Sequence, residues 1–312
     1  MFIRIQPAWK TVFRLAFSAL AVIFISYQLD FKALYHYVAQ INISYYLLAI
    51  VLQIVSGLVA AYKWGKIMDR IGYQSHYNFY AKAYLVSSMF NQVLPTSVGG
   101  DAVRVAYAHK LGGDLRKGFY GVFADRYYGI IGLLILNAST LFWLHDKIPS
   151  SVYTVVCLVT FTIGSSLLAA LIPSQLHFLK EIKFIRGIYQ LSHVLINSMG
   201  SLRQSLILLL LAILSNFLTI YAAYLIALSL NLPIQLLDLL GIMPVITLIT
   251  LLPISFAGWG LREGAMVGFL LFLDLPKAAI LALSLLYGVM LILASLPGLY
   301  IYLFHRVEPA TQ

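Results

Sequence analysis

The same short pattern occurs twice in this chain: Leu-Pro-Thr-Ser-Val-Gly-Gly at residues 94–100 and Leu-Pro-Ile-Ser-Phe-Ala-Gly at residues 252–258. Each copy lies within an apolar stretch, and charged residues follow it within a few positions. Proline removes a backbone donor that a helix needs, and glycine permits backbone conformations that a lipid-facing helix would not tolerate. Two such breaks in corresponding halves of a membrane protein indicate a binding site between repeats.

The composition predicts an all-α polytopic membrane protein. Of 312 residues, 61% are hydrophobic and 10% are charged, and the mean hydropathy is +0.89. Soluble domains carry about 25% charged residues. The longest polar interval, 174–203, is too short to fold as a separate soluble domain. We therefore expect a single transmembrane domain over residues 1–312.

The basic residues and the single cysteine exclude some classes of partner. The net charge of +10 is explained by lysine and arginine in short loops, which are positive on the cytoplasmic side of membranes. Contact with anionic lipid headgroups is a further use of that charge, and no nucleic-acid partner is expected. Cys157 lies within an apolar stretch, so neither a disulfide framework nor a thiolate metal site is predicted.

Apolar stretches predict eight membrane segments. Two of them, 83–100 and 238–272, contain the proline and glycine breaks. The others are long enough to cross roughly 30 Å of hydrocarbon. These six predicted spans are 11–29, 44–62, 119–143, 151–173, 204–230 and 277–304.

Loop charges predict how the two broken stretches lie. Residues 63–82 and 101–117 are both basic, and the positive-inside rule places both on the cytoplasmic side. The stretch 83–100 is therefore predicted to enter from the cytoplasm and turn back, and 238–272 to do so from the other side. Both termini are then cytoplasmic. The alternative, in which both stretches cross fully, places the basic segment 101–117 outside.

This topology makes the two halves, 44–143 and 204–304, an inverted repeat of span, re-entrant hairpin and span. Irregular backbone at membrane depth is tolerated only where protein buries it or water reaches it. The two breaks are therefore expected to face each other or a shared cavity. The half-helices that end at each break favour an anionic group.

Charged residues cluster around the breaks. Asp101 and Arg104 are three residues apart, so on a helix they share a face and can pair. Asp125 and Arg126 open an apolar run and are predicted at or just below the headgroup level. Intramembrane ionisable residues indicate function, and arginine binds two phosphate oxygens at once. The alternative is that these pairs, with Arg262 and Glu263 after the second break, neutralise one another and hold half-helices together.

Polar uncharged residues also lie within the apolar stretches. Asn91 and Gln92, just before Pro95, are predicted either to line a cavity or to satisfy carbonyls freed by the proline. Asn137, Ser139 and Thr140 are typical of hydrogen bonds between membrane helices.

Motifs for enzymatic chemistry are not found in the sequence. The seven histidines are scattered singly, without zinc-binding spacing, and no Walker loop or Gly-x-Ser-x-Gly elbow occurs. We therefore predict no metal site, no cofactor and no catalytic residue.

Two longer stretches carry a resemblance to a known family. Residues 91–104, followed by 123–129, resemble the first signature of the lysylphosphatidylglycerol synthase transmembrane family, which is also described as flippase-like. Residues 253–264 are similar to its second signature, and the likeness spans about residues 8–305. The functional residues that the resemblance implies for this chain are Asn91, Pro95, Gly99, Gly100, Arg104, Asp125, Arg126, Pro253, Gly258, Gly260 and Glu263.

The resemblance implies an integral inner-membrane protein that handles lipids or lipid-linked sugars. In the full-length synthase this module translocates an aminoacylated phospholipid, while a separate cytosolic domain transfers the lysyl group. This sequence ends at Gln312 without a stretch for that domain, so lysyl transfer is not expected of it.

The favoured function is therefore a translocator in the bacterial cytoplasmic (inner) membrane, moving an anionic phospholipid or lipid-linked headgroup. One alternative is a membrane glycosyl- or aminoacyl-transferase with Asp101, Asp125 or Glu263 as base; another is a scaffold for such an enzyme. The expected partners are membrane lipids, with a separate lipid-modifying enzyme as a further candidate. The predicted substrate-binding residues are Asn91, Pro95, Gly99, Gly100, Asp101, Arg104, Asp125, Arg126, Pro253, Ser255, Gly258, Gly260, Arg262 and Glu263.

Overall fold

The computed structural model describes residues 31–94, 99–112, 114–175, 186–252, 255, 257–305 and 307. These residues are helical or lie in short connections, and no strand occurs among them, as the composition predicted. Five described helices are long and apolar enough to cross a membrane. They match five of the six predicted spans, and the sixth, 11–29, lies outside the described residues. The five are α3 (Ile43–Arg70), α6 (Leu115–Leu144), α7 (Ser150–Ala169), α9 (Leu202–Ser229) and α12 (Lys277–Phe304).

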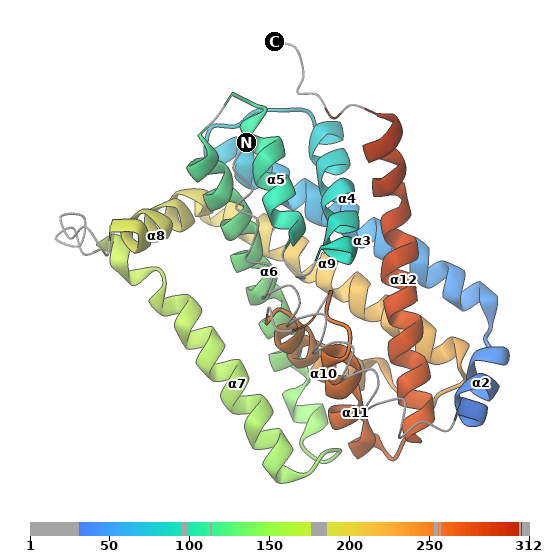
Figure 1. Cartoon of the computed structure of the whole chain (residues 1–312). Helices are drawn as coiled ribbons and strands as arrows, with labels where there is room; N and C mark the ends of the chain where they lie inside the picture. Colours follow the sequence, from blue (N-terminus) through green and yellow to red (C-terminus); the bar gives the residue numbers. More distant parts are fainter. Residues whose placement is uncertain are drawn as a thin grey trace.

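Helices α3 and α9 form a long antiparallel pair across the molecule (Figure 1). At one end the backbone N–H of Asn42 donates to the carbonyl of Ser229 at 2.9 Å. Nearer the middle the Ser56 hydroxyl donates to the Ser215 carbonyl at 2.8 Å. Hydroxyl and small side chains allow membrane helices to approach closely and bond across their interface.

Two helical hairpins lie between the long helices. The first consists of α4 (Tyr77–Val93) and α5 (Gly99–His109), the second of α10 (Leu236–Thr250) and α11 (Leu261–Leu270). Each of these helices is shorter than the about 20 residues that a bilayer crossing needs. The hairpins approach the middle of the molecule from opposite ends (Figure 1).

The end of α4 has a local cause in the sequence. Leu94 follows the last helical residue with φ −82° and ψ 150°. The proline ring disfavours helical backbone at the residue before it, and α4 ends there, whereas α10 and α12 continue through Pro244 and Pro297. Pro95 itself lies outside the described residues, as does Pro253 of the second break.

Helix contacts follow the same pattern in both halves. Helix α4 packs against α12, and its counterpart α10 packs against α6. In the same way α3 contacts α12 while α9 contacts α6, and α5 contacts α6 while α11 contacts α12. A two-fold relation between residues 44–143 and 204–304 requires these matched contacts. The inverted repeat itself stays a prediction.

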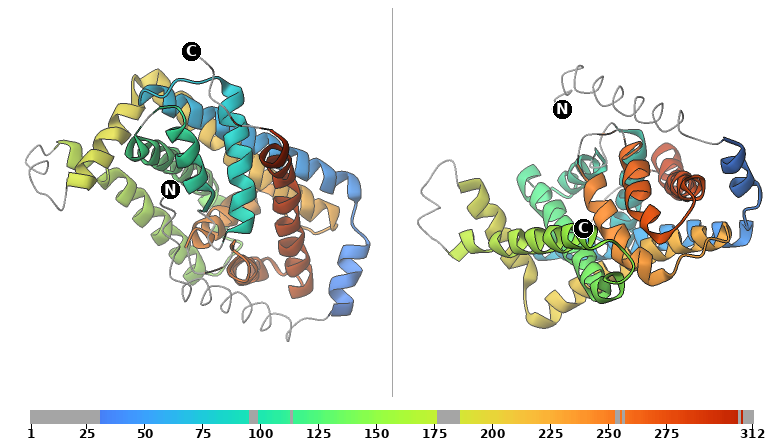
Figure 2. Two further views of the ribbon diagram at one scale, coloured as in Figure 1. Left: turned by 45° about the horizontal axis from the view of Figure 1, so that its top comes forward. Right: turned by 90° about the horizontal axis from the view of Figure 1, so that it is seen from below.

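The remaining described elements surround this arrangement. Helix α7 packs on α6, and α8 (Arg186–Met199) contacts α6 and the short η1 (Ile172–Gln175). Helix α2 (Phe31–Ala39) packs against α12 on the opposite side of the molecule (Figure 2). A short η3 (Leu271–Leu273) follows α11.

The bounds of the first hairpin differ from the prediction. The sequence indicated a broken stretch at 83–100, whereas the hairpin runs from 77 to 109. Its returning helix carries Asp101 and Arg104, and these charges lower the hydropathy of a segment that is nevertheless packed between helices. The predicted loop 63–82 was also too long, because α3 continues to Arg70. The second hairpin, 236–270, lies close to the predicted 238–272.

Candidate functional site

A cavity of about 320 Å³ lies where both hairpins meet the long helices. Its wall includes residues of α3, α4, α5, α6, α9, α10, α11 and α12. This volume is at the lower end of the range for small-molecule sites. The predicted site residues in its wall are Asn91, Asp101, Arg104, Asp125, Arg126, Gly258 and Arg262.

A continuous chain of ion pairs borders the cavity on the side of the first hairpin. Lys63 of α3 lies 3.0 Å from Asp125 of α6, and Asp125 lies 2.7 Å from Arg104 of α5. Arg104 also pairs with Asp101 at 2.5 Å, and Asp101 pairs with Arg126 of α6 at 2.8 Å. The predicted pairing of Asp101 with Arg104 is confirmed. These ion pairs connect α3, α5 and α6.

Arg104 is the buried centre of this chain. Its side chain is 3% exposed, and its guanidinium lies 5.3 Å from the Trp64 ring and 5.0 Å from the Tyr84 ring. A buried charge is tolerated when opposite charges and hydrogen bonds replace its hydration. The two carboxylates and the aromatic faces do this, so Arg104 holds the site together.

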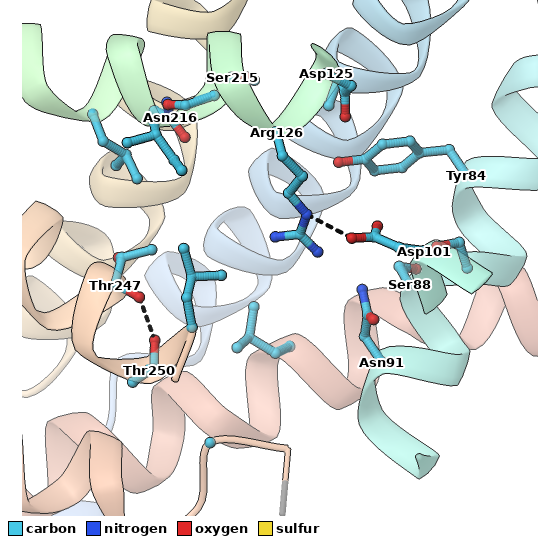
Figure 3. A pocket seen from close by; sticks show the side chains of 18 of the residues that line it. Tyr84, Ser88, Asn91, Asp101, Asp125, Arg126, Ser215, Asn216, Thr247 and Thr250 are labelled. Atoms are coloured by element: carbon cyan, nitrogen blue, oxygen red, sulfur yellow. Dashed lines mark hydrogen bonds and ion pairs between the residues drawn. The ribbon is translucent and has the colours of Figure 1, made fainter. Parts of the chain in front are cut away.

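Arg126 differs from Arg104 in its exposure. Its side chain is 31% exposed, and its Nε donates to Asp101 at 2.8 Å. Its two terminal nitrogens make no hydrogen bond to any described residue. Figure 3 shows the guanidinium extending between Asp101 and Thr247 into the cavity. This planar fork is therefore placed to bind two oxygens of an anionic group.

The second hairpin carries a comparable arginine. Arg262 pairs with Glu263 at 2.6 Å and lies over the Trp259 ring at 4.6 Å. Glu263 also accepts hydrogen bonds from the Gly260 N–H at 2.6 Å and the Ser284 hydroxyl at 3.3 Å. Glu263 is not itself in the cavity wall.

The two arginines occupy matching places after the two breaks. Arg104 lies ten residues after Leu94, and Arg262 lies ten residues after Leu252. Both are buried, both contact aromatic rings, and both line the same cavity. Each hairpin thus contributes one paired arginine to the wall.

Glycines shape the tips of the hairpins. Gly258 has φ +83° and Gly260 has φ +82°, a left-handed conformation that only glycine adopts without strain. Ala257, which lines the cavity, also has a positive φ of 48°. In the first hairpin, the Gly100 N–H donates to the Asn91 side-chain oxygen at 2.7 Å. Asn91 therefore lines the cavity and also accepts a hydrogen bond from the backbone. Its backbone partner is an N–H group, whereas the prediction was a carbonyl freed by the proline.

Some predicted site residues lie apart from the cavity. Ser255 is 2% exposed and does not line it. Gly99 begins α5 at the hairpin tip. Asp125 and Arg126 were predicted near the headgroup level. In the structure Asp125 lies ten residues into α6, roughly 15 Å along the helix, and Asp114 caps α6 before the apolar run begins. The depth of both residues in the bilayer stays a prediction.

The sequence analysis missed several wall residues. Lys63 was assigned to a cytoplasmic loop, yet its side chain is 4% exposed and paired with Asp125. Its position directly after the predicted span 44–62 could have indicated that the helix continues and carries Lys63 inside the protein. Tyr84, Asn216 and Thr247 also line the cavity. Asn137 donates to the Gly241 carbonyl at 2.5 Å, so its predicted interhelical bond is confirmed. Ser139 and Thr140 instead donate to carbonyls of their own helix, so the prediction was wrong for these two. No group of three metal-binding side chains occurs in the part of the chain that the structure describes.

The two signatures fall on the two hairpins and on α6. Over residues 11–298 the sequence matches the family described as Lysylphosphatidylglycerol synthase TM region. The chain belongs to this family. Membership makes it a multi-pass membrane protein of lipid metabolism or translocation. A search of curated proteins found no match.

Proposed function

We propose that this chain is a flippase-like translocator of anionic lipids in the bacterial cytoplasmic (inner) membrane. The headgroup binds in the central cavity while the acyl tails stay in the bilayer. The observation that carries this proposal is Arg126, whose terminal nitrogens extend into a cavity walled by both hairpins. The family's connection to lipid metabolism supports it.

In this proposal both hairpins are re-entrant, and the termini are cytoplasmic. The exposed side chains of Lys66, Lys110, Arg116 and Lys117 lie near the base of the first hairpin, where α3 ends and α6 begins. The last residues of α12 lie at the same end of the molecule (Figure 1). The positive-inside rule assigns this end to the cytoplasm.

Two-sided access follows from rocking of the two halves about the cavity. Each half carries its own paired arginine, so a headgroup stays near a cation as one side closes and the other opens. The lipid gradient or an ion gradient drives the movement, with Asp125 or Glu263 as the candidate proton site.

Scrambling of labelled lipid in proteoliposomes tests the proposal. Fluorescent phosphatidylglycerol is distributed over both leaflets, and the accessibility of its headgroup to an external quencher is followed with time. We expect Arg126→Ala to slow scrambling about tenfold or more, because a hydrogen bond to a charged group contributes about 1.5–3 kcal/mol. Arg116→Ala, an exposed arginine on the same helix, should scramble at the wild-type rate. Folded wild-type protein that scrambles no anionic lipid would contradict the proposal.

A further inference from the structure

Two matched pairs of helices run from the central cavity toward opposite ends of the molecule. Helices α6 and α10 pack together and both line the cavity, as do α12 and α4. Helix α10 begins at the end of the molecule where α6 ends, and α4 begins where α12 ends (Figure 1). A path from either end to the cavity opens where the two helices of a pair separate. We call the two contacts the α6–α10 seam and the α4–α12 seam.

A buried carboxylate closes the α6–α10 seam at the end away from the cavity. Asp238, in the first turn of α10, accepts two hydrogen bonds at Oδ1: from the Trp143 indole N–H at 2.9 Å and from the Lys147 ammonium at 2.8 Å. Its Oδ2 accepts from the Gln235 backbone N–H at 2.9 Å. The Lys147 Nζ also lies 4.3 Å from the centre of the Trp143 ring. We call the side chains of Trp143, Lys147 and Asp238 the Asp238 clamp.

Separation of the seam would strand this carboxylate. The Asp238 side chain is 4% exposed, and the Lys147 side chain is 31% exposed. Two of the three donors to Asp238 come from α6 and the turn after it. Hydrogen bonds to a charged group are stronger than neutral ones, and a buried charge that loses its partners is strongly disfavoured. The clamp therefore holds α10 against the end of α6.

The α6–α10 seam is also tight between the clamp and the cavity. Asn137 of α6 donates to the Gly241 carbonyl of α10. A Cβ added to Gly241 would collide with the Leu144 side chain. The seam is thus closed from the clamp inward, and α10 then continues to Thr247 and Thr250 in the cavity wall.

The α4–α12 seam is held differently. No ion pair joins α4 to α12 among the described residues, and the His76 side chain does not cap the start of α4. Close packing holds this seam instead: Phe90 meets Tyr302 edge to face, with ring centres 5.2 Å apart. Packed helices can slide past each other by small shear motions. Of the two matched seams, the α6–α10 seam is therefore the one fixed by charge.

We propose that the Asp238 clamp is a lock on access to the cavity from this end, and that it opens in each transport cycle. The inference rests on the proposed function, which places this end outside the cytoplasm. The three clamp residues do not line the cavity, so they are positioning residues that act through α6 and α10. Breaking the clamp should favour the state in which the cavity is open to the outside.

Reaction of a cavity cysteine with a membrane-impermeant maleimide, added to intact cells, measures this opening. The reporter is Thr247→Cys in a Cys157→Ser background. We expect Asp238→Asn and Lys147→Met each to speed its reaction about tenfold or more, as the loss of a hydrogen bond to a charged group provides. Lys147→Arg keeps the charge and should react close to the parent rate.

Controls separate the lock from a general loss of structure. Asp146→Asn removes a neighbouring carboxylate that is 89% exposed and should leave the reporter rate unchanged. Trp143→Phe keeps the ring, removes only the N–H donor, and should give a smaller rise in the same direction. The unfolding temperature of each purified variant in detergent shows whether it is folded. Asp146→Cys, without the reporter, should react in intact cells and shows that this end faces outside.

The outcomes distinguish this inference from the proposed function. An unchanged reporter rate in the folded clamp variants overturns the lock and leaves the clamp a structural contact. A parent reporter that already reacts as fast as Asp146→Cys overturns it as well, because the cavity is then open to the outside with the clamp intact. No reaction of Asp146→Cys in intact cells overturns the assignment of this end to the outside, and the lock with it. Faster reporter reaction in clamp variants of a chain that scrambles no anionic lipid supports the lock and contradicts the translocator.

Discussion

At the scale of single residues, two arginines of the same ion-pair chain differ in how far their side chains are buried. Arg104 contacts two carboxylates and two aromatic rings, and its side chain is 3% exposed. Arg126 has one carboxylate partner and is 31% exposed. The Nη1 and Nη2 of Arg104 are each paired with a carboxylate, while its Nε is buried without a hydrogen-bond partner. The two paired nitrogens can take a new ligand only by losing a carboxylate. We therefore expect Arg104 to act as a positioning residue, and Arg126 is the residue that we propose contacts the headgroup.

Loss of one carboxylate tests this positioning role. Asp125→Asn removes the charge shared by Lys63 and Arg104, leaving Lys63 without its ion pair in the interior. We expect this variant to be destabilised by about 3–5 kcal/mol, the cost of breaking a buried pair. Unfolding in detergent, followed by temperature or denaturant, measures it. Asp146→Asn, whose side chain is 89% exposed, is the control, and equal stability of the two variants would contradict the argument.

At the scale of elements, the first hairpin closes through a direct approach of backbones. A Cβ added to Gly100 would collide with the Ser87 carbonyl oxygen and would lie 2.8 Å from the Asn91 side-chain oxygen. The same glycine donates its N–H to Asn91. The separation of α4 and α5 at the tip therefore depends on the absence of a side chain, and this separation sets where Asp101 and Arg104 lie.

Substitution of this glycine should open the hairpin. Gly100→Ala forces α5 away from α4, and we expect a loss of stability of about 1–3 kcal/mol, typical of overpacking, together with weaker lipid binding. Gly268→Ala places a methyl group in open space on α11. It should be neutral or slightly stabilising, because alanine favours helix over glycine. Thermal unfolding of both variants measures this difference in stability. Equal unfolding temperatures would contradict the close backbone approach at Gly100.

At the scale of the whole molecule, two short hairpins from opposite ends meet among five long helices. No described arm of either hairpin has the length to cross a bilayer. Irregular backbone can lie at membrane depth only when protein surrounds it or water reaches it. Long helices pack against both hairpins, and each hairpin contributes residues to the wall of the central cavity.

Labelling of single cysteines tests this topology in intact cells. In a Cys157→Ser background, cysteines replace His76 before α4, Lys110 after α5, and Asp146 at the far end of α6; all three positions are exposed. If α4 and α5 form a re-entrant hairpin, positions 76 and 110 react with a membrane-impermeant maleimide only after the cells are opened, and position 146 reacts before. Reaction of position 110 from outside, with 76 protected, would show instead that the segment crosses the membrane.

The amino-acid sequence by itself determined the class of this protein, its long helices and the two breaks. These properties are local: apolar length selects a membrane helix, and the ring of Pro95 disfavours helical backbone at Leu94. Family membership likewise follows from residues read in order. Tertiary structure alone decided which charges meet. The burial of Lys63 and of Asp125 depends on how far α3 and α6 extend past their apolar cores and pack against each other.

The Asp238 clamp and the unequal exposure of Arg104 and Arg126 arise from contacts between helices far apart in the sequence. Hydropathy and charge spacing describe one helix at a time. Pairing, burial and empty volume are properties of several helices packed together, and they decide which polar residue is buried in ion pairs and which one extends into the cavity.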